Sequence, residues 1–210
     1  MTDAERPYHS PLREAQAGQT RVHIVETMIR LLAETGGVDF AVRKLAEAAG
    51  VSERTVYRYF PDREALLDAV NDHFGEVMST GRREQELADL DELARFVPDV
   101  FGDFDQHAAA TKAAFLINPD PARILPTQQR RTELMIDVCR RSFPDLPEAD
   151  QRRLGQLVRT LTSTFSWLRM REEFDMMADE SGELIGWVVE CVTEEVRRTG
   201  RVGRSPDESS

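Results

Sequence analysis

Apolar residues recur along most of this chain at the spacing of an α-helix, and almost no segment alternates between apolar and polar residues as a half-buried strand does. No internal repeat is evident in the sequence. The pattern therefore predicts an all-α fold. The first helix is expected over residues 20–35, and Gly36 and Gly37 end it. Its apolar stripe consists of Val22, Val25, Met28, Ile29 and Leu32.

Two short helices are predicted next, within the stretch KLAEAAGVSERTVYRYF at residues 44–60. Asp39 is a candidate N-cap for the first of them, and Gly50 suits the left-handed position just past its end. Ser52 is a favourable N-cap for the second helix. Asp62 is the expected N-cap of a longer helix, so the pattern predicts a compact three-helix head joined to a fourth helix.

In the remainder of the chain, the apolar pattern predicts a larger helical body that ends in two long helices. Apolar residues at near-heptad spacing indicate one helix from Leu154 to Leu168 and a second from Leu184 to Val196. The stretch ADESGE, at residues 178–183, is expected to separate them. Apolar faces of this length can pack as an antiparallel pair.

We therefore divide the chain into four parts. Residues 1–19 and 200–210 are polar and contain proline and glycine, so we expect a disordered arm and a disordered tail. Residues 20–80 are expected to form the head with its connecting helix. Residues 81–199 are expected to form a regulatory and dimerisation domain.

The composition is that of a globular protein with an acidic surface. Of the 210 residues, 40% are hydrophobic and 31% are charged, and the formal net charge is -11. This charge weighs against nonspecific coating of nucleic acid, which depends on many Lys and Arg side chains at phosphates. Residues 43–63 nevertheless carry five basic and three acidic side chains, so a small DNA-reading head on an acidic body fits the charge.

No targeting or membrane segment is evident. No apolar run approaches the roughly 20 residues that span a bilayer, and the N-terminal stretch has no apolar signal core. We therefore expect a cytoplasmic protein that does not contact a membrane. Cys139 and Cys191 are far apart and outside any CxxC pair, which predicts two ordinary buried thiols rather than a disulfide or a zinc site.

The stretch at residues 44–60 has the features of a steep corner between two helices. Ala46 is small enough to lie where the helices touch, and Gly50 supplies a turn residue without a Cβ atom. An αα-hairpin that only packs against a core would also have these features. It would not explain two arginines and two tyrosines on a two-turn helix, whereas a helix that enters the major groove needs such donors. That outer face carries Arg54, Thr55, Tyr57, Arg58 and Tyr59.

The segment VRKLAEAAGVSERTVYRYFPDREALLDAV resembles the DNA-binding head of the TetR family of bacterial transcriptional regulators. The resemblance runs from Thr20 to about Phe74, and the L-A-x-x-A-G-V-S core and the T-x-Y-x-Y-F run carry it. It implies a helix-turn-helix and a homodimer that binds a palindromic operator in double-stranded DNA. It also implies regulation, most often repression of nearby genes, under the control of an unknown small-molecule effector.

The resemblance further implies roles for individual side chains. Arg43 matches a position that often contacts a base or a phosphate, and Thr55 matches one that reaches bases. Tyr57 and Tyr59 match aromatic positions at the DNA backbone or bases, and Arg63 matches a phosphate contact. The complete set of expected DNA-binding residues is Arg43, Lys44, Ser52, Arg54, Thr55, Tyr57, Arg58, Tyr59 and Arg63.

Arg54 and Arg58 lie at positions that vary in the family, which suits sequence discrimination. An arginine can donate to both acceptors of a guanine, for about 1–3 kcal/mol of discrimination. The N-terminal residues of a recognition helix enter the groove most deeply, so we expect Arg54 rather than Arg58 to read guanine. The chain departs from the family at Phe40 and Ala41, where Ser or Thr usually precedes the position of Val42, so no side-chain phosphate contact is expected there.

The body is expected to hold an effector pocket and the dimer interface. Aromatic and methionine side chains can line an apolar cavity between helices, although they also suit an ordinary core. The candidates for ligand binding are Phe101, Phe104, Phe115, Met135, Phe165 and Trp167. The last two helices are expected to form a four-helix interface with a second copy. The candidates for it are Leu157, Leu161, Leu168, Ile185, Val188, Val189 and Val192.

No sequence feature favours an enzyme. The chain has no nucleophile elbow, P-loop or HExxH motif, and no cofactor is implied. His107 with Asp103 and Asp105 is better explained by an aspartate cap at a helix start than by a metal site. The alternative function is a helical small-molecule-binding or adaptor protein that has lost specific DNA binding, which the acidic net charge favours.

Overall fold

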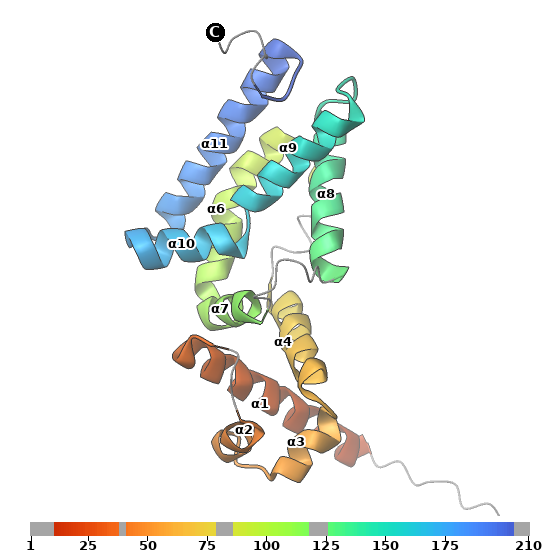
Figure 1. Cartoon of the computed structure of the whole chain (residues 1–210), viewed down its shortest axis with the longest axis vertical. Helices are drawn as coiled ribbons and strands as arrows, with labels where there is room; N and C mark the ends of the chain where they lie inside the picture. Colours follow the sequence, from red (N-terminus) through yellow and green to blue (C-terminus); the bar gives the residue numbers. More distant parts are fainter. Residues whose placement is uncertain (1–10, 38–40, 79–85, 118–125, 204–210) are drawn as a thin grey trace, which may run out of the picture.

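The molecule is built from helices, arranged as a small head at one end of the long axis and a larger body at the other (Figure 1). The computed structural model describes residues 11–37, 41–78, 86–117 and 126–203. Within these ranges the regular structure is helical, which confirms the predicted all-α fold.

The head consists of α1 (Pro11–Thr35), α2 (Val42–Ala48) and α3 (Glu53–Tyr59), and α4 (Arg63–Val77) leads to the body. The body consists of α6 (Leu90–Gln106), α7 (Ala108–Leu116), α8 (Pro126–Ser142), α9 (Glu148–Leu161), α10 (Thr164–Phe174) and α11 (Ala178–Thr199).

The apolar stripe of α1 forms the core of the head. Ile24 and Met28 are fully buried, and α2 and α4 both pack against this helix. Leu45 of α2 and Val56 of α3 are also buried, and α2 packs against both α1 and α3, so it joins the second short helix to the head. Because helices of this length are marginal alone in water, their stability comes from this packing.

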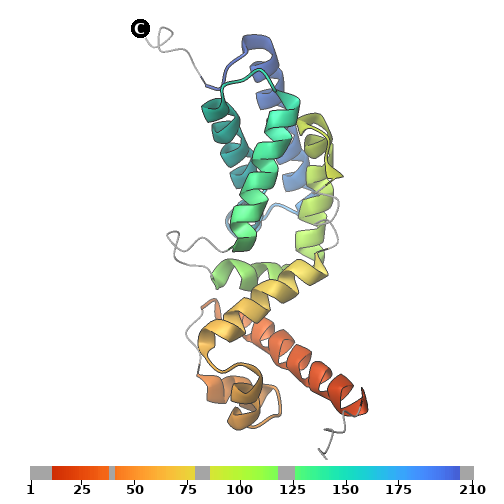
Figure 2. The same cartoon turned by 90° about the vertical axis from the view of Figure 1, so that its right-hand side faces the viewer.

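The head and the body share one continuous core. Helix α7 packs across both α1 and α4, and Figure 2 shows it lying between the head and the rest of the body. Phe74 of α4 stacks on Phe104 of α6, with ring centroids 6.5 Å apart. The orientation of the head is therefore coupled to the packing of α6 and α7.

Helices α6 and α11 approach closely because two glycines face α6. A Cβ atom at Gly182 would lie 2.7 Å from the Cα atom of Pro98, and one at Gly186 would lie 2.6 Å from the carbonyl oxygen of Ala94. Ile185 and Val189 lie on the same side of α11 and are buried. This side of α11 is therefore buried in the core of the protomer.

Helix α1 begins earlier than the sequence predicts. It starts at Pro11 rather than near Thr20, so residues 11–19 are helical and not part of a disordered arm. Proline is favourable at a first helical position because its missing N–H would have no partner there. Residues 1–10 of the predicted arm, and residues 204–210 of the predicted tail, lie outside the described residues.

The predicted helix from Leu154 to Leu168 is wrong, because it is interrupted at Thr162. The Thr162 hydroxyl donates to the carbonyl of Val158, and Ser163 begins a new helix by accepting from the Ser166 N–H (3.3 Å). Such local bonds from serine and threonine compete with helix continuation.

The predicted separator ADESGE is instead the first part of α11. The chain breaks earlier, at Asp175, which adopts the left-handed conformation with φ 55°. Asp179 and Glu180 then lie in the first turn of α11, where acidic side chains favour a helix start.

Neither cysteine forms a disulfide, and the two lie in different environments. Cys139 is buried as expected, and its desolvation raises the pKa of the thiol to about 12, so it stays protonated. Cys191 is exposed, so the expectation of two buried thiols is wrong for this residue. Among the helices of the described residues, none is long and apolar enough to cross a membrane.

Candidate nucleic-acid interface

The turn between α2 and α3 has the geometry of a steep corner. Gly50 adopts φ +64°, a left-handed conformation that residues with a Cβ atom rarely take. The N–H of Val51 donates to the carbonyl of Ala46 (3.0 Å), which closes the turn. Ala46 is 3% exposed, so the small side chain predicted for the helix contact is in place.

Ser52 fixes the start of α3. Its hydroxyl oxygen accepts from the backbone N–H of Thr55 (3.1 Å), as a serine N-cap does. The hydroxyls of Ser52 and Thr55 are also hydrogen-bonded to each other (2.9 Å). Asp62 caps α4 in the same way, through the N–H of Ala65 (2.8 Å). Both predicted caps are therefore confirmed.

The inner face of α3 anchors it to the head. Val56 is 1% exposed and Phe60, directly after the helix, is 2% exposed. His23 of α1 adds a contact that the sequence did not suggest, since its Nε2 atom donates to the carbonyl of Ala49 at the end of α2 (3.1 Å). The corner is thereby held on α1 by both apolar packing and a hydrogen bond.

The outer face of α3 presents hydrogen-bond donors to solvent. Arg54 and Arg58 are exposed, and Tyr57 is 50% exposed. Arg58 is held by Tyr59, because its guanidinium donates to the phenolic oxygen (3.0 Å) and lies 4.8 Å from the ring centroid. Arg54 forms no hydrogen bond or ion pair with any described residue, so its donors are free to meet a base.

The remaining predicted DNA-binding residues flank this face. Lys44 is exposed on α2, and Arg43 beside it forms an exposed ion pair with Glu47 (3.7 Å) that contributes little to stability. Arg63 is exposed at the first position of α4.

The start of α2 lacks a side-chain cap. Its N-cap is Ala41, and no side chain of the described residues caps this end. Asp39, the predicted cap, and Phe40 lie outside the described residues.

Comparison with known proteins identifies this head. The model of the bacterial regulatory proteins of the tetR family matches residues 24–70, which contain the corner and the outer face of α3. The chain belongs to the TetR family. It is therefore a DNA-binding transcriptional regulator and not an enzyme.

Relatives and solved structures resemble the chain beyond the TetR-family head. It is 28% identical over 162 residues to the HTH-type transcriptional regulator BetI of Serratia proteamaculans (strain 568), covering 71% of this chain and 79% of that protein. A TetR-like transcriptional regulator from Rhodococcus sp. RHA1 superposes with a TM-score of 0.62 at 12% identity, over 81% of this chain and 93% of that one.

A further solved structure shares the fold. It is NalD, the secondary repressor of the MexAB-OprM multidrug efflux pump in Pseudomonas aeruginosa. It superposes with a TM-score of 0.57 at 16% identity, over 84% of this chain and 96% of that one. The all-α body is thus a TetR-family body in its arrangement of helices.

Within this TetR-family body, the predicted ligand-binding side chains mostly fill the core. Phe104 packs against Phe101 (centroids 5.9 Å apart) and edge-on against Trp167 (6.1 Å). Met135 is also buried. The indole N–H of Trp167 is buried and has no acceptor among the described residues.

Two of the predicted ligand-binding residues lie at or near the surface. Phe165 is 49% exposed, so its assignment to an interior cavity is corrected. Its ring packs against that of half-buried Phe115, with the centroids 5.9 Å apart. This pair covers the side of α7 that faces α10.

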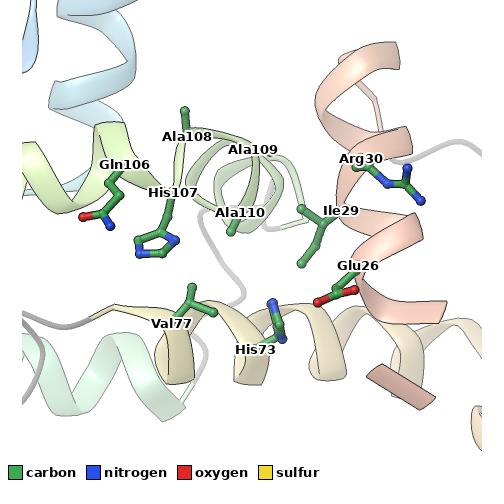
Figure 3. A pocket seen from close by; sticks show the side chains of 10 residues that line it. All are labelled: Glu26, Ile29, Arg30, His73, Val77, Gln106, His107, Ala108, Ala109 and Ala110. Carbon is green, nitrogen blue, oxygen red and sulfur yellow. The ribbon is translucent and has the colours of Figure 1, made fainter. Parts of the chain in front are cut away.

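A cleft of about 390 Å³ lies instead at the junction of head and body (Figure 3). Glu26, Ile29 and Arg30 of α1 line one side, His73 and Val77 of α4 another, and residues 106–110 of the α6–α7 turn the third. No local pattern of residues predicts this cleft, because its three sides come from distant segments of the chain.

The predicted dimer residues divide into two groups. Leu168, Ile185 and Val189 are 6%, 4% and 1% exposed, so they belong to the protomer's own core and their assignment to the interface is corrected. The others remain accessible. Leu157 is 42% exposed, and Leu161, Val188 and Val192 are half-buried.

The residues around His107 do not form the predicted cap. Asp103 and Asp105 lie in the last turns of α6 rather than at a helix start, and Asp105 pairs with Arg171 of α10. The His107 Nε2 atom lies 3.8 Å from the carboxylate of buried Asp103. Among the described residues, no group of three or more His, Cys, Asp or Glu is arranged to hold a metal ion.

Proposed function

We propose that this regulator is a cytoplasmic homodimer that represses nearby genes by binding a palindromic operator, and that a small-molecule effector releases it. The observation that carries the proposal is the outer face of α3, where unpaired Arg54 and exposed Tyr57 stand on a capped, buried corner. A helix so anchored can enter a major groove without losing its own packing.

The roles of individual side chains follow from their positions on α3. Arg54 is the second residue of the helix and has free donors, which suits a bidentate contact with guanine. Thr55 and Tyr57 lie beside it and extend the reading face, and Ser52 and Lys44 lie where the corner would approach the backbone. Arg43 and Arg63 flank the face and suit phosphate contacts.

The dimer is supported by an exposed apolar surface on the last helices. Leu184 and Trp187 of α11 are 39% and 59% exposed, and Val188 lies beside them. These residues lie on the side of α11 opposite the glycines that contact α6, and Leu157 of α9 is exposed as well. A two-fold pairing through this surface would place two heads on half-sites about 34–36 Å apart.

The effector part of the proposal is supported by the cleft between head and body. It is bounded by α1 and α4 on one side and by the α6–α7 turn on the other, so anything that occupies it acts on the head's attachment. NalD is a repressor of an efflux pump, and a γ-butyrolactone receptor shares the fold. Proteins with this fold therefore include both a repressor and a receptor for a small molecule. To release the DNA, the effector must bind the protein more tightly in one orientation of the head than in the other.

Base reading is tested by paired arginine variants. Selection from a random DNA pool should recover a palindrome with wild-type protein. Arg54→Ala should lose about 1–3 kcal/mol of discrimination at one base pair of each half-site, because a bidentate guanine contact disappears. Arg63→Ala should weaken binding to all sequences alike, because phosphates carry no sequence information. An Arg54→Ala variant that keeps the wild-type preference at every position would refute this role.

The dimer surface is tested by placing a charge on it. Trp187→Glu should raise the dimer dissociation constant by at least about tenfold, because a tryptophan that acts as an interface hot spot typically contributes about 2 kcal/mol or more. Sedimentation equilibrium measures the constant. Val22→Glu is the control, since Val22 is 44% exposed but lies on α1 of the head. An unchanged dimer in Trp187→Glu would exclude this surface.

The effect of the cleft is tested by filling it. Ala109→Trp places a large side chain in the cleft at an exposed position of α7. It should change the affinity for the selected operator by about 5- to 10-fold, the lower end of typical allosteric coupling. Fluorescence anisotropy with labelled operator measures the affinity. Ala149→Trp, at an exposed position of α9, should leave it unchanged. If both variants bind the operator with the affinity of the wild type, the cleft is not coupled to DNA binding.

A further inference from the structure

A row of arginine and aromatic side chains borders the C-terminal end of α3. The Arg58 guanidinium lies over the Tyr59 ring at 4.8 Å, and the Tyr59 and Phe60 ring centroids are 6.5 Å apart. At the other end of the row, the Arg21 guanidinium lies over the Phe60 ring at 5.3 Å. Two cations from different helices, α1 and α3, therefore flank one pair of aromatic rings.

Both guanidiniums keep their hydrogen-bonding edges available. Arg21 forms no hydrogen bond or ion pair with a described residue, and Arg58 donates only to the Tyr59 hydroxyl (3.0 Å) among them. A guanidinium that stacks through its face presents its N–H groups in the plane, where they can reach a phosphate. Stacking also fixes the side chain before binding, which lowers the entropy lost on association.

Many arginines of the body differ from Arg21 and Arg58 in having a carboxylate partner, as expected for a chain with net charge -11. The pairs are Arg140–Asp137, Arg152–Glu148, Arg153–Asp150, Arg169–Glu173, Arg171–Asp105, Arg197–Asp91 and Arg198–Glu195. Two of these arginines, Arg169 and Arg171, also lie over an aromatic ring. Arg21 and Arg58 have aromatic partners but no carboxylate partner among the described residues, so their positive charge remains available to an anion.

The position of the row points to DNA as that anion. Phe60 follows the last residue of α3 directly, and the side chain of Arg21 reaches its ring from α1. When the N-terminal part of α3 lies in the major groove, its C-terminal end lies toward the groove edge. The groups at that edge are backbone phosphates.

We propose that Arg21 and Arg58, stacked on Phe60 and Tyr59, form a phosphate clamp that grips the DNA backbone beside each half-site. Arg21 is the new element, because it brings α1 into the DNA contact. The clamp adds affinity without sequence preference, while Arg54 supplies discrimination. This inference rests on the proposed DNA-binding function and extends it to a second surface of the head.

The salt dependence of DNA affinity tests the clamp. Each phosphate contact contributes about 0.9 to the slope of log K against log salt concentration. Arg21→Ala should therefore reduce the magnitude of the slope by about 1.8 for a dimer with two heads. The loss of affinity should be the same on the selected operator and on a scrambled duplex. Arg21→Lys should keep the slope but bind more weakly than wild type, because lysine retains the charge without the planar stack.

Arg140→Ala is the control, because it removes one positive charge from the surface of the body. Arg140 is exposed on α8 and pairs with Asp137, away from the head and the junction cleft. Its slope should equal that of wild type.

Two results would overturn the clamp. They are a wild-type slope in Arg21→Ala, or a slope in Arg140→Ala that falls by as much as the slope in Arg21→Ala. If wild-type protein binds neither duplex, the proposed function itself fails, and this outcome is distinct from failure of the clamp. Thermal unfolding of each variant separates loss of contact from loss of fold.

Discussion

The apolar stripe of α1 is the constraint on which both halves of the molecule depend. One side of this helix buries Ile24 and Met28 against the short helices and α4, and its C-terminal half also meets α7 of the body. The recognition helix is only seven residues long and cannot hold its position alone. Its orientation relative to the body is therefore set by how α1 and α4 pack on α7. A change at that junction is transmitted directly to the DNA-binding face.

The distribution of charge explains how an acidic chain can present a DNA-binding surface. In the body, carboxylates within one helical turn or on a neighbouring helix neutralise many arginines, and these exposed pairs contribute little to stability. On the head, Arg54 has no such partner and Arg21 is held by an aromatic ring. The net charge of the chain is thus a poor guide to DNA binding, because binding depends on which arginines remain unpaired on one face.

The corner was predictable from the sequence because its determinants are local. Gly50 supplies the left-handed turn, and Ser52 and Asp62 accept hydrogen bonds three residues ahead, so each signal lies within one turn of its effect. The break at Thr162 was not predictable from apolar spacing, which continues through it. There, side-chain hydroxyls bond to the backbone and end the helix although the apolar pattern does not change.

The two faces of α11 show a different limit of sequence reasoning. Apolar residues occur on both sides of this helix, so periodicity alone could not decide which side is core. Ile185 and Val189 proved buried, while Trp187 proved exposed. The useful signal was Gly182 and Gly186, four residues apart, which mark the side that approaches α6 within van der Waals distance. The junction cleft had no comparable signal, since its sides join segments from α1, α4 and the α6–α7 turn.

The most direct test of the central claim, that α3 and its corner read DNA, is an electrophoretic shift of the duplex upstream of the protein's own gene. The protein should first be shown to be a folded dimer in the same buffer. We expect a discrete shift that survives excess unrelated duplex and weakens steeply as salt rises, because specific contacts are superimposed on phosphate contacts. A folded dimer that shifts neither this duplex nor any duplex selected from a random pool would show that α3 does not read DNA.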